Sequence, residues 1–360
     1  MRILQIIDSL ETGGAERIAI SYANALAQKV DFSGLVATRK EGGLKPQISD
    51  NVSYLFLGRK NVTDISAVLR LRKYCITNRV EFLHAHSSSY FIAILVKLTY
   101  PKLKIIWHDH YGMSEFLPIR KSRILKAASY LFSGIVVVNR HLEKWAHQHL
   151  NCRQVLYIPN FMQQPTFSGN KTILKGTDGK RVLCMANLRP QKNHKLLLDV
   201  AATIMKTHPD WTFHLVGKNF NDDYSADITA YIADMNLLQN VFIYGSRTDT
   251  MNIINASDIA VLASKSEGLP VALLEYGAAK KPVVVTDVGE IPTIIRNGKN
   301  GLMVNSGDKN AFGEALLQLI LSDDLRQKLG CALYDTVTHE FSEEAAVSNY
   351  IKWMESLTNG

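Results

Sequence analysis

The amino-acid sequence predicts an α/β protein made of two doubly wound domains. Short apolar runs alternate with amphipathic segments at the spacing of βαβ units, which favours mostly parallel sheets. The alternation stops near residue 165, in a stretch without apolar periodicity, and then starts again. The chain has 360 residues, 46% of them hydrophobic and 21% charged, which is ordinary globular composition and enough length for two cores.

The first domain is predicted to span residues 1–165. Its strands are expected at residues 3–7, 35–38, 52–57, 82–84, 104–107, 135–138 and 155–158, and its helices at 15–28, 64–78, 90–98, 121–132 and 142–150. A linker is expected at residues 163–172 and 175–180, where apolar periodicity is lost.

The second domain is predicted to span residues 166–340. Its strands are expected at residues 182–186, 212–216, 241–244, 259–263, 282–286 and 302–304, and its helices at 194–207, 225–235, 249–256, 271–280 and 311–321. Residues 341–360 form a last segment, in which apolar residues recur at helical spacing from Val347 to Met354. We expect an amphipathic helix there that packs on another part of the chain, with a return to the first domain as one option.

Composition restricts the class of protein. The cysteines are widely scattered and form no CxxC pair, which argues against a disulfide framework or a structural zinc and fits a reducing compartment. The N-terminal apolar run is too short for a signal peptide, and the apolar run at residues 90–96 is too short to span a bilayer. We therefore expect a cytoplasmic protein.

The formal net charge of +8 is carried by residues 1–165, whereas the remainder is slightly acidic. A basic half can attract an anionic membrane surface or an acidic acceptor, and the basic segment at residues 118–126 leads an amphipathic helix that could lie on anionic lipid. An ordinary solvated surface is the equally weighted alternative. Nucleic acid is not expected as a partner, because no nucleic-acid-binding motif or interleaved aromatic residues accompany the charge.

The most informative motif holds two glutamates, Glu267 and Glu275. A buried strand at residues 258–263 precedes it, and a helix begins after Pro270, which suits a first helical position. Carboxylates accept hydrogen bonds from sugar hydroxyls, and the free N–H groups of a helix N-terminus suit phosphate. The motif therefore predicts a ligand with both groups, a sugar nucleotide.

Two further loops follow predicted strands. Arg189 and Lys192 are close enough in sequence to converge on one diphosphate, one as a planar fork and the other as a point charge. Gly13 and Gly14 precede the first helix and let backbone approach a ligand there, although the loop is not a GxGxxG fingerprint.

Histidines end two neighbouring predicted strands, as Leu83-His-Ala-His86 and Trp107-His-Asp-His-Tyr111. Two histidines at i and i+2 share one face of a strand, so a metal site is an option. No cysteine or glutamate joins them at ligand spacing, and we expect no metal.

The segment Glu267-Gly-Leu-Pro-Val-Ala-Leu-Leu-Glu275, with Pro282-Val-Val-Val-Thr-Asp-Val-Gly-Glu-Ile-Pro292 after it, resembles the E-x7-E region of retaining glycosyltransferases of the GT-B fold, most closely glycosyltransferase family 4. The loop that contains Arg189 and Lys192 resembles the family's GRLxxxKG loop, with Asn187 and Asn193 in place of glycines. Residues 13–16 resemble its GGAE loop. The resemblance covers nearly the full length and implies two Rossmann-like domains, the first on the acceptor side and the second binding the nucleotide sugar.

The resemblance also implies roles for individual residues. Glu275 would bond the ribose and Glu267 the donor sugar, while Arg189 and Lys192 would neutralise the leaving diphosphate. Further implied contacts are the backbone N–H groups of Leu269, Val271 and Ala272 to sugar and diphosphate, Gly13 and Gly14 near the donor phosphate, His108 (or His110, because the register is ambiguous) near the donor sugar, Arg247 near the base, and His84 and His86 as support.

The expected activity is a retaining, metal-independent transfer of a sugar from a UDP- or GDP-sugar, without a cofactor. The acceptor would be a hydroxyl of a glycan or lipid-linked glycan, in cell-surface polysaccharide or lipopolysaccharide synthesis. Two alternatives stay open at this point: a nucleotide-sugar epimerase of the same fold, and a non-enzymic nucleic-acid-binding module.

Overall fold

The computed structural model describes residues 1–61, 64–111, 117, 120–161 and 171–357, and the chain divides into two compact units. Unit 1 comprises Met1–Asn160 with Glu343–Gly360, and unit 2 comprises Phe161–Ser342. The divisions fall close to the predicted boundaries at residues 165 and 340. Most of the predicted linker at residues 163–172 lies outside the described residues, whereas residues 175–180 contain no helix or strand.

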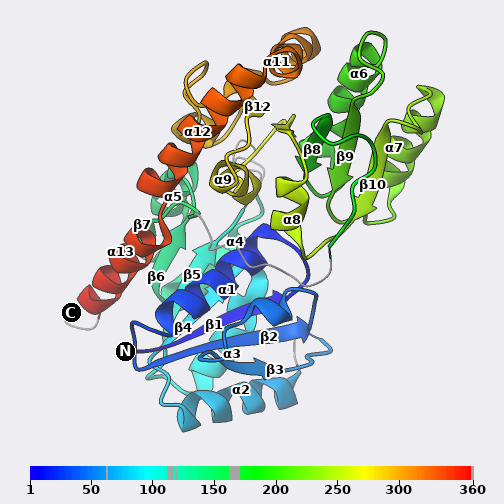
Figure 1. The fold of residues 1–360 in the computed structure, drawn as a ribbon. Coiled ribbons are helices and arrows are strands. Elements are labelled where there is room, and N and C mark those ends of the chain that lie inside the picture. Colours follow the sequence, from blue (N-terminus) through cyan, green and yellow to red (C-terminus); the bar gives the residue numbers. More distant parts are fainter. Residues whose placement is uncertain (62–63, 112–116, 118–119, 162–170, 358–360) are drawn as a thin grey trace. The chain divides into compact units, whose positions relative to one another are not determined.

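Unit 1 is built on a parallel sheet in the order β3-β2-β1-β4-β5-β6-β7 (Figure 1). Its strands are β1 (Arg2–Ser9), β2 (Phe32–Lys40), β3 (Ser53–Phe56), β4 (Phe82–His86), β5 (Lys104–Asp109), β6 (Phe132–Val137) and β7 (Val155–Tyr157). Its helices are α1 (Gly14–Leu26), α2 (Ile65–Thr77), α3 (Tyr90–Thr99), α4 (Arg123–Ala128), α5 (Arg140–His149) and α13 (Glu343–Ser356).

Both faces of this sheet are covered, as apolar strands in a parallel sheet require. Helices α2, α3 and α5 contribute to the larger apolar cluster on one face, and α1 contributes to the cluster on the other (Figure 1). The C-terminal helix α13 packs beside α1. A Cβ atom on Gly134 would lie 2.4 Å from the Trp353 ring of α13, so the close approach of this helix requires glycine in β6.

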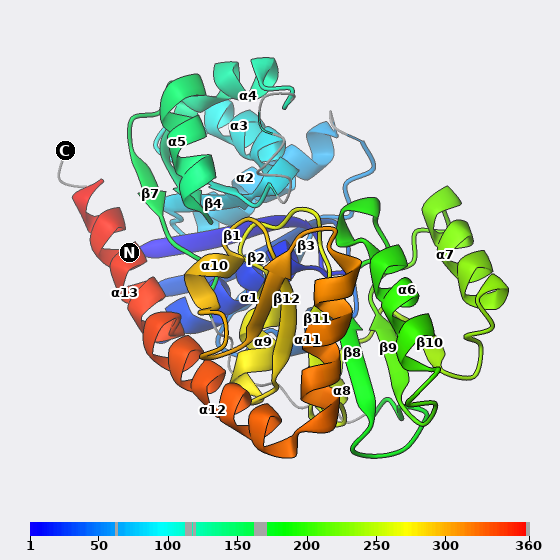
Figure 2. The same cartoon turned by 90° about the horizontal axis from the view of Figure 1, so that it is seen from above.

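Unit 2 is built on a second parallel sheet, in the order β10-β9-β8-β11-β12-β13 (Figure 2). Its strands are β8 (Arg181–Met185), β9 (Thr212–Val216), β10 (Val241–Gly245), β11 (Ile259–Leu262), β12 (Val283–Asp287) and β13 (Leu302–Asn305). Its helices are α6 (His194–Ile204), α7 (Asp223–Asp234), α8 (Thr250–Asn255), α9 (Val271–Ala278), α10 (Ile291–Ile294), α11 (Lys309–Leu321) and α12 (Asp323–Glu340).

The predicted strands and helices occur in both units, with two differences. The helix expected at residues 121–132 is shorter, because α4 gives way to a 3-10 turn at Ser129–Leu131 and Phe132 already belongs to β6. Helices α10 and α12 were not predicted. Within the described residues, no helix is both long enough and apolar enough to cross a membrane.

Candidate functional site

In unit 2 the chain places its charged loops at one edge of the sheet. Strands β9 and β10 continue to one side of β8, and β12 and β13 continue to the other side of β11. Neighbouring β8 and β11 therefore mark the topological switch point, where doubly wound sheets bind ligands at the carboxyl ends of strands. Arg189 and Lys192 follow β8, and Glu267 follows β11, so the topology brings these predicted residues together.

Glu267 is the centre of this site. Lys192 Nζ donates to Glu267 Oε1 at 2.6 Å and to Oε2 at 2.7 Å, and Ser264 Oγ donates to Oε1 at 2.7 Å. Glu267 is 4% exposed and Ser264 is fully buried. A cation and a hydroxyl thus stabilise the negative charge of a nearly buried carboxylate and fix its orientation.

The loop after β12 packs against the backbone of Glu267 and Gly268. Gly289 has φ +57°, in the left-handed region that favours glycine, and a Cβ atom there would lie 2.0 Å from the Glu267 carbonyl oxygen. The backbone N–H of Glu290 donates to the Gly268 carbonyl oxygen at 3.2 Å. The close approach of the two loops explains the glycine at position 289.

The loop after β8 keeps its shape despite the two asparagines. Asn193 adopts φ +53°, which asparagine tolerates better than most residues, and Asn187 Oδ1 accepts the Lys218 N–H at 2.8 Å. Arg189 is exposed, and its guanidinium lies 4.5 Å from the centroid of the Phe220 ring. The charge of Arg189 is therefore presented to solvent on an aromatic support.

Helix α9 follows the Glu267 loop. Pro270 is its N-cap, one position earlier than the predicted first helical position, and the N–H groups of Val271 and Ala272 open the helix. Leu269 is buried, and Glu275 lies in the second turn at 9% exposure. The Tyr276 hydroxyl accepts the Met185 N–H at 2.7 Å, which anchors α9 to β8.

Arg247 is not part of this charged group. It follows β10, which is separated from β11 by β9 and β8. Among the described residues, its Nη1 donates to the Ser246 carbonyl oxygen at 2.9 Å. A role at the base therefore stays a prediction.

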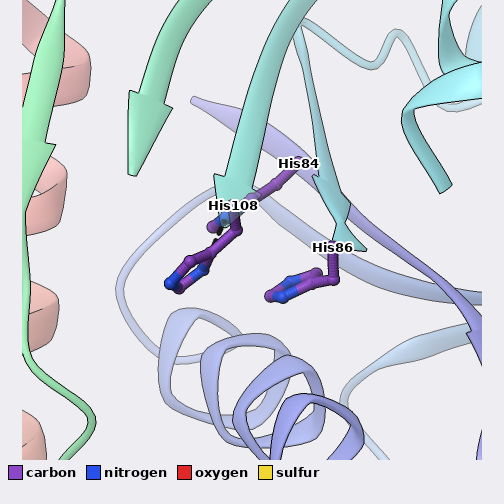
Figure 3. Close-up of side chains that lie close together, drawn as sticks. All are labelled: His84, His86 and His108. Atoms are coloured by element: carbon purple, nitrogen blue, oxygen red, sulfur yellow. Dashed lines mark hydrogen bonds between the residues drawn. The ribbon is translucent and has the colours of Figure 1, made fainter. Parts of the chain in front are cut away.

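Unit 1 contains a different polar centre, which we call the histidine ladder: Gln5, His84, His86, His108, His110 and Tyr350. His84 and His86 project from β4 and His108 from β5 to the side of the sheet that α1 covers (Figure 3). His86 and His108 are opposite each other in the β4–β5 register, and Gln5 is opposite His84 in the β1–β4 register. The alternation of side chains along strands thus places all of them on one face.

Two hydrogen-bonded chains run through the ladder. Tyr350 OH lies 2.8 Å from His84 Nδ1, and His84 Nε2 lies 3.2 Å from His108 Nδ1. In the second chain, His86 Nε2 lies 2.8 Å from Gln5 Oε1, and His86 Nδ1 lies 2.9 Å from His110 Nε2. An amide oxygen only accepts, so His86 carries its proton on Nε2 and His110 donates to His86 Nδ1.

The first chain can run in either direction. If Tyr350 donates to His84, His84 donates to His108, and the N–H at His108 Nε2 is left without a partner among the described residues. In the reverse direction, the Tyr350 hydroxyl hydrogen is left without a partner among these residues instead, and His108 Nε2 carries no proton. Each direction therefore leaves one buried donor unpaired.

The ladder is neutral. Burial, with a smaller contribution from neighbouring histidines, holds the pKa of His84, His86 and His108 well below the ordinary value for histidine. Burial likewise lowers the pKa of His110 to about 3. Desolvation disfavours the charged imidazolium, so each ring carries one proton that a hydrogen bond can direct.

A metal ion is the other ligand that such a cluster could hold. One nitrogen from each of His84, His86 and His108 lies within 4.8 Å of the others. The His84 ring, however, is stacked on His86 and His108 at interplanar angles of 18° and 15°, so the lone pairs do not point at one centre. Both nitrogens of His84 and of His86 are already in hydrogen bonds. The geometry is that of a hydrogen-bonded ladder.

His108 and His110, the two histidines predicted near the donor sugar, differ in exposure. His108 is 1% exposed, whereas His110 is only partly buried at the end of β5. Asp109, between them, is bound bidentately by Arg120 at 2.6 and 2.9 Å and is buried. His110 is therefore the more exposed of the two histidines.

Gly13 and Gly14 lie where the sequence placed them, at the start of α1 after β1. Gly13 is the N-cap in extended backbone, and a Cβ atom there would lie 2.2 Å from Glu16 Oε2. Gly14 is exposed. The Glu16 carboxylate thus lies against the glycine turn.

Sequence reasoning missed several residues of both centres: Gln5, Phe220, Ser264, Gly289, Arg120 and Tyr350. Ser264 could have been predicted, because it lies three residues before Glu267 in the loop that follows β11. Gln5 and Tyr350 carry no local signal, since their partners lie 81 and 266 residues away.

Comparison with known proteins agrees with this geometry. The family model "Glycosyltransferase Family 4" matches residues 12–163, and "Glycosyl transferases group 1" matches residues 170–335. The chain is 24% identical over 351 residues to the UDP-Gal:alpha-D-GlcNAc-diphosphoundecaprenol alpha-1,3-galactosyltransferase of Escherichia coli, covering 88% of this chain and 89% of that protein. It is 27% identical over 173 residues to the poly(ribitol-phosphate) alpha-N-acetylglucosaminyltransferase of Staphylococcus aureus, covering 48% of this chain and 34% of that protein.

Solved structures show the same fold. Anabaena HepE in complex with UDP-glucose superposes with a TM-score of 0.79 at 16% identity, covering 99% of this chain and 100% of that chain. The two family models together cover most of the sequence, and the two parallel sheets agree with the fold of the solved structures. The chain therefore belongs to the family 4 and group 1 glycosyltransferases and is an enzyme of the GT-B fold.

Proposed function

We propose that this glycosyltransferase moves a sugar from a UDP- or GDP-sugar to a hydroxyl of a glycan or lipid-linked glycan, with retention at the anomeric carbon and without a metal. The observation that carries the proposal is the Lys192–Glu267–Ser264 arrangement at the switch point of unit 2, beside Arg189. It combines a carboxylate of fixed orientation, which can accept hydrogen bonds from sugar hydroxyls, with two cations that can bind a diphosphate. The UDP-glucose complex of HepE supports a nucleotide-sugar donor.

Each of the predicted site residues in the loops after β8 and β11 and in α9 has a role in this proposal. Arg189 and Lys192 hold the diphosphate and offset the charge that grows on it as the sugar leaves. Glu267 holds sugar hydroxyls, Glu275 the ribose, and the start of α9 the phosphate oxygens. Glu267 already accepts from Lys192 and Ser264, which suits a positioning group better than a proton-abstracting base.

In unit 1 we assign the contact with a sugar hydroxyl to His110. Its Nε2 is directed to His86, so its Nδ1 is the nitrogen left to accept from a ligand. His108 supports it from beneath. The Gly13–Gly14 turn allows a phosphate-bearing ligand to approach backbone.

The acceptor is proposed to be anionic. Two relatives act, by name, on acceptors that carry phosphate, a diphosphoundecaprenol-linked GlcNAc and poly(ribitol-phosphate). The basic character of residues 1–165 favours such a substrate and a peripheral position on an anionic inner membrane surface. Exposed Ile124 and Tyr130, beside Arg123 and Lys126, support membrane contact at α4; Pro118 and Ile119 of the predicted basic segment lie outside the described residues.

Product analysis tests the proposal. The protein is incubated with a panel of UDP- and GDP-sugars, with and without a lipid-diphosphate-linked glycan, and products are identified by mass spectrometry and NMR. We expect a glycosylated acceptor whose new linkage keeps the anomeric configuration of the donor, in the presence of a chelator. Conversion of the donor sugar without acceptor would instead indicate an epimerase, and an inverted or chelator-sensitive linkage would contradict the proposed mechanism.

A further inference from the structure

Unit 1 contains a buried arginine whose donors are only partly used. Arg59 follows β3, and its side chain is 1% exposed. Its Nη2 lies 3.3 Å from Asp8 Oδ1, whereas its Nε and Nη1 are buried without a hydrogen-bond partner among the described residues. A guanidinium has five N–H donors in a planar fork, and burying them unpaired is unfavourable.

The carboxylate that Arg59 contacts, that of Asp8, is already shared. Asp8 Oδ1 accepts from Thr38 Oγ1 at 2.6 Å, and Asp8 Oδ2 accepts from Ser88 Oγ at 2.6 Å. A second guanidinium approaches the same Oδ1, because Arg39 Nε lies 3.8 Å from it. Two guanidinium groups thus converge on a single carboxylate, and one positive charge remains in excess.

Two further charged groups near Arg59 have opposite signs, and the excess therefore remains. Lys60 is exposed and adds a further cation. Asp64 accepts from Ser66 Oγ and from the backbone N–H groups of Ala67 and Lys60, so it is committed to capping α2. Burial is the main cause that lowers the pKa of Arg59, with Asp8 and Asp64 opposing it and Arg39 adding to it. A second anion would stabilise this charge.

The position in the fold is one where ligands bind. Asp8 and Arg39 lie at the carboxyl ends of β1 and β2, and Arg59 follows β3. Strands β1 and β4 mark the topological switch point of this sheet, and Ser88, just after β4, donates to Asp8 across it. Doubly wound sheets bind ligands at this place.

We propose that Arg59 and Arg39 form an anion-binding subsite of unit 1 that takes a phosphate group of the acceptor. The inference rests on the proposed transfer to a phosphate-bearing acceptor and extends it to named residues. Arginine suits this role because its fork can bind two phosphate oxygens at once. The phosphate could belong to a lipid-linked diphosphate or to a polyol phosphate.

The direct test observes the Arg59 Nε–H by NMR while inorganic phosphate is added. The Arg189→Ala/Lys192→Ala double variant is used, so that phosphate cannot bind the cations of unit 2. The Arg59→Lys variant assigns the resonance by its loss. We expect a saturable shift of the Arg59 signal; a signal that stays in place while phosphate is raised to millimolar concentration would overturn the subsite. The titration itself is made with Arg59 intact and needs no sugar transfer.

Affinity provides the second test. In the same background, Arg59→Gln is expected to weaken phosphate binding about tenfold or more, since hydrogen bonds to a charged group are lost. Arg153→Gln is the matched control, because it removes an exposed arginine of the same unit. Equal affinity in the Arg59→Gln and control variants would refute the inference.

The affinities of pyrophosphate and glycerol phosphate distinguish the two possible sources of the phosphate group. Tighter binding of pyrophosphate than of glycerol phosphate would assign the subsite to a lipid-linked diphosphate, and the reverse order to a polyol phosphate. Phosphate binding at Arg59 without any detectable sugar transfer would sink the proposed function and leave the subsite standing.

Discussion

The two units hold their polar centres by opposite means. In unit 2, Glu267 is charged and paired with Lys192, and the exposed Arg189 lies nearby. In unit 1, the histidine ladder is neutral, deeply buried and held by hydrogen bonds between rings. The charged site also joins distant residues, because Lys192 and Glu267 are 75 positions apart, but both lie in loops after neighbouring strands and Arg189 beside them faces water. A neutral ladder depends on complete burial and therefore on distant parts of the chain, above all α13.

The largest expected effect is the response of the ladder to acid. The folded-state pKa of each ladder histidine lies below the unfolded value of about 6.5, so the unfolded chain binds more protons as the pH falls. The contribution of each histidine to the free energy of unfolding is present above pH 6.5. It is lost as the pH falls below 6.5, by about 1.4 kcal/mol per pH unit until the folded-state pKa of that histidine is reached.

Amide hydrogen exchange at pH 7 and pH 5 measures this effect in each unit. Unit 2 has His194 and His214, whose pKa burial lowers to about 4, and should lose less protection than unit 1. Equal losses in β4 and β8 would show that the ladder is not the acid-sensitive element.

The second effect concerns the ion pair of unit 2. Lys192→Ala removes a cation from the leaving group and leaves Glu267 without its partner, so we expect the rate of sugar transfer to fall by about 100- to 1,000-fold. Lys206→Ala, which removes an exposed lysine after α6, should transfer sugar at the normal rate. Steady-state kinetics with matched circular dichroism checks both; near-normal transfer by Lys192→Ala would exclude this residue from the mechanism.

A smaller effect is expected from Ser264→Ala. The substitution removes one hydrogen bond to a charged carboxylate and should lower kcat/KM for the donor about tenfold, chiefly through KM. Ser306→Ala is the matched control, because Ser306 Oγ donates to the Ser264 carbonyl oxygen at 3.2 Å and not to Glu267. Identical kinetics for the two variants would mean that Ser264 does not position Glu267.

The smallest effect is expected from Tyr350→Phe. Loss of the hydroxyl leaves His84 Nδ1 unpaired and should cost about 1 kcal/mol of unfolding free energy in urea. Tyr130→Phe, at a site that is 75% exposed, should cost nothing measurable. An equal cost in both would show that the Tyr350–His84 bond contributes no stability.

The difference between the units also explains what the sequence could predict. The strands and the charged loops of unit 2 follow from local patterns, because Arg189 and Lys192 lie in one loop and Glu267 and Glu275 lie in one motif. The ladder pairs Gln5 with His86 and Tyr350 with His84, and no local pattern reports such contacts.

Helix α12 was missed for another reason. It contains Gly330 and two threonines, which weaken its helical pattern, although Ser322 caps it by accepting the Leu325 N–H. The serine followed by two aspartates was a usable start signal. The roles of Glu275, Arg247 and His108 stay predictions, because they concern ligand contacts.

Donor binding in unit 2 is the central claim, and thermal unfolding with a panel of UDP- and GDP-sugars tests it most directly. At least one of them should raise the melting temperature of the wild-type protein, and the same compound should have little effect on Glu275→Ala, with Glu314→Ala as the control for loss of a carboxylate in unit 2. If no nucleotide sugar stabilises the wild type, or if Glu275→Ala is stabilised equally, unit 2 does not hold the donor as described.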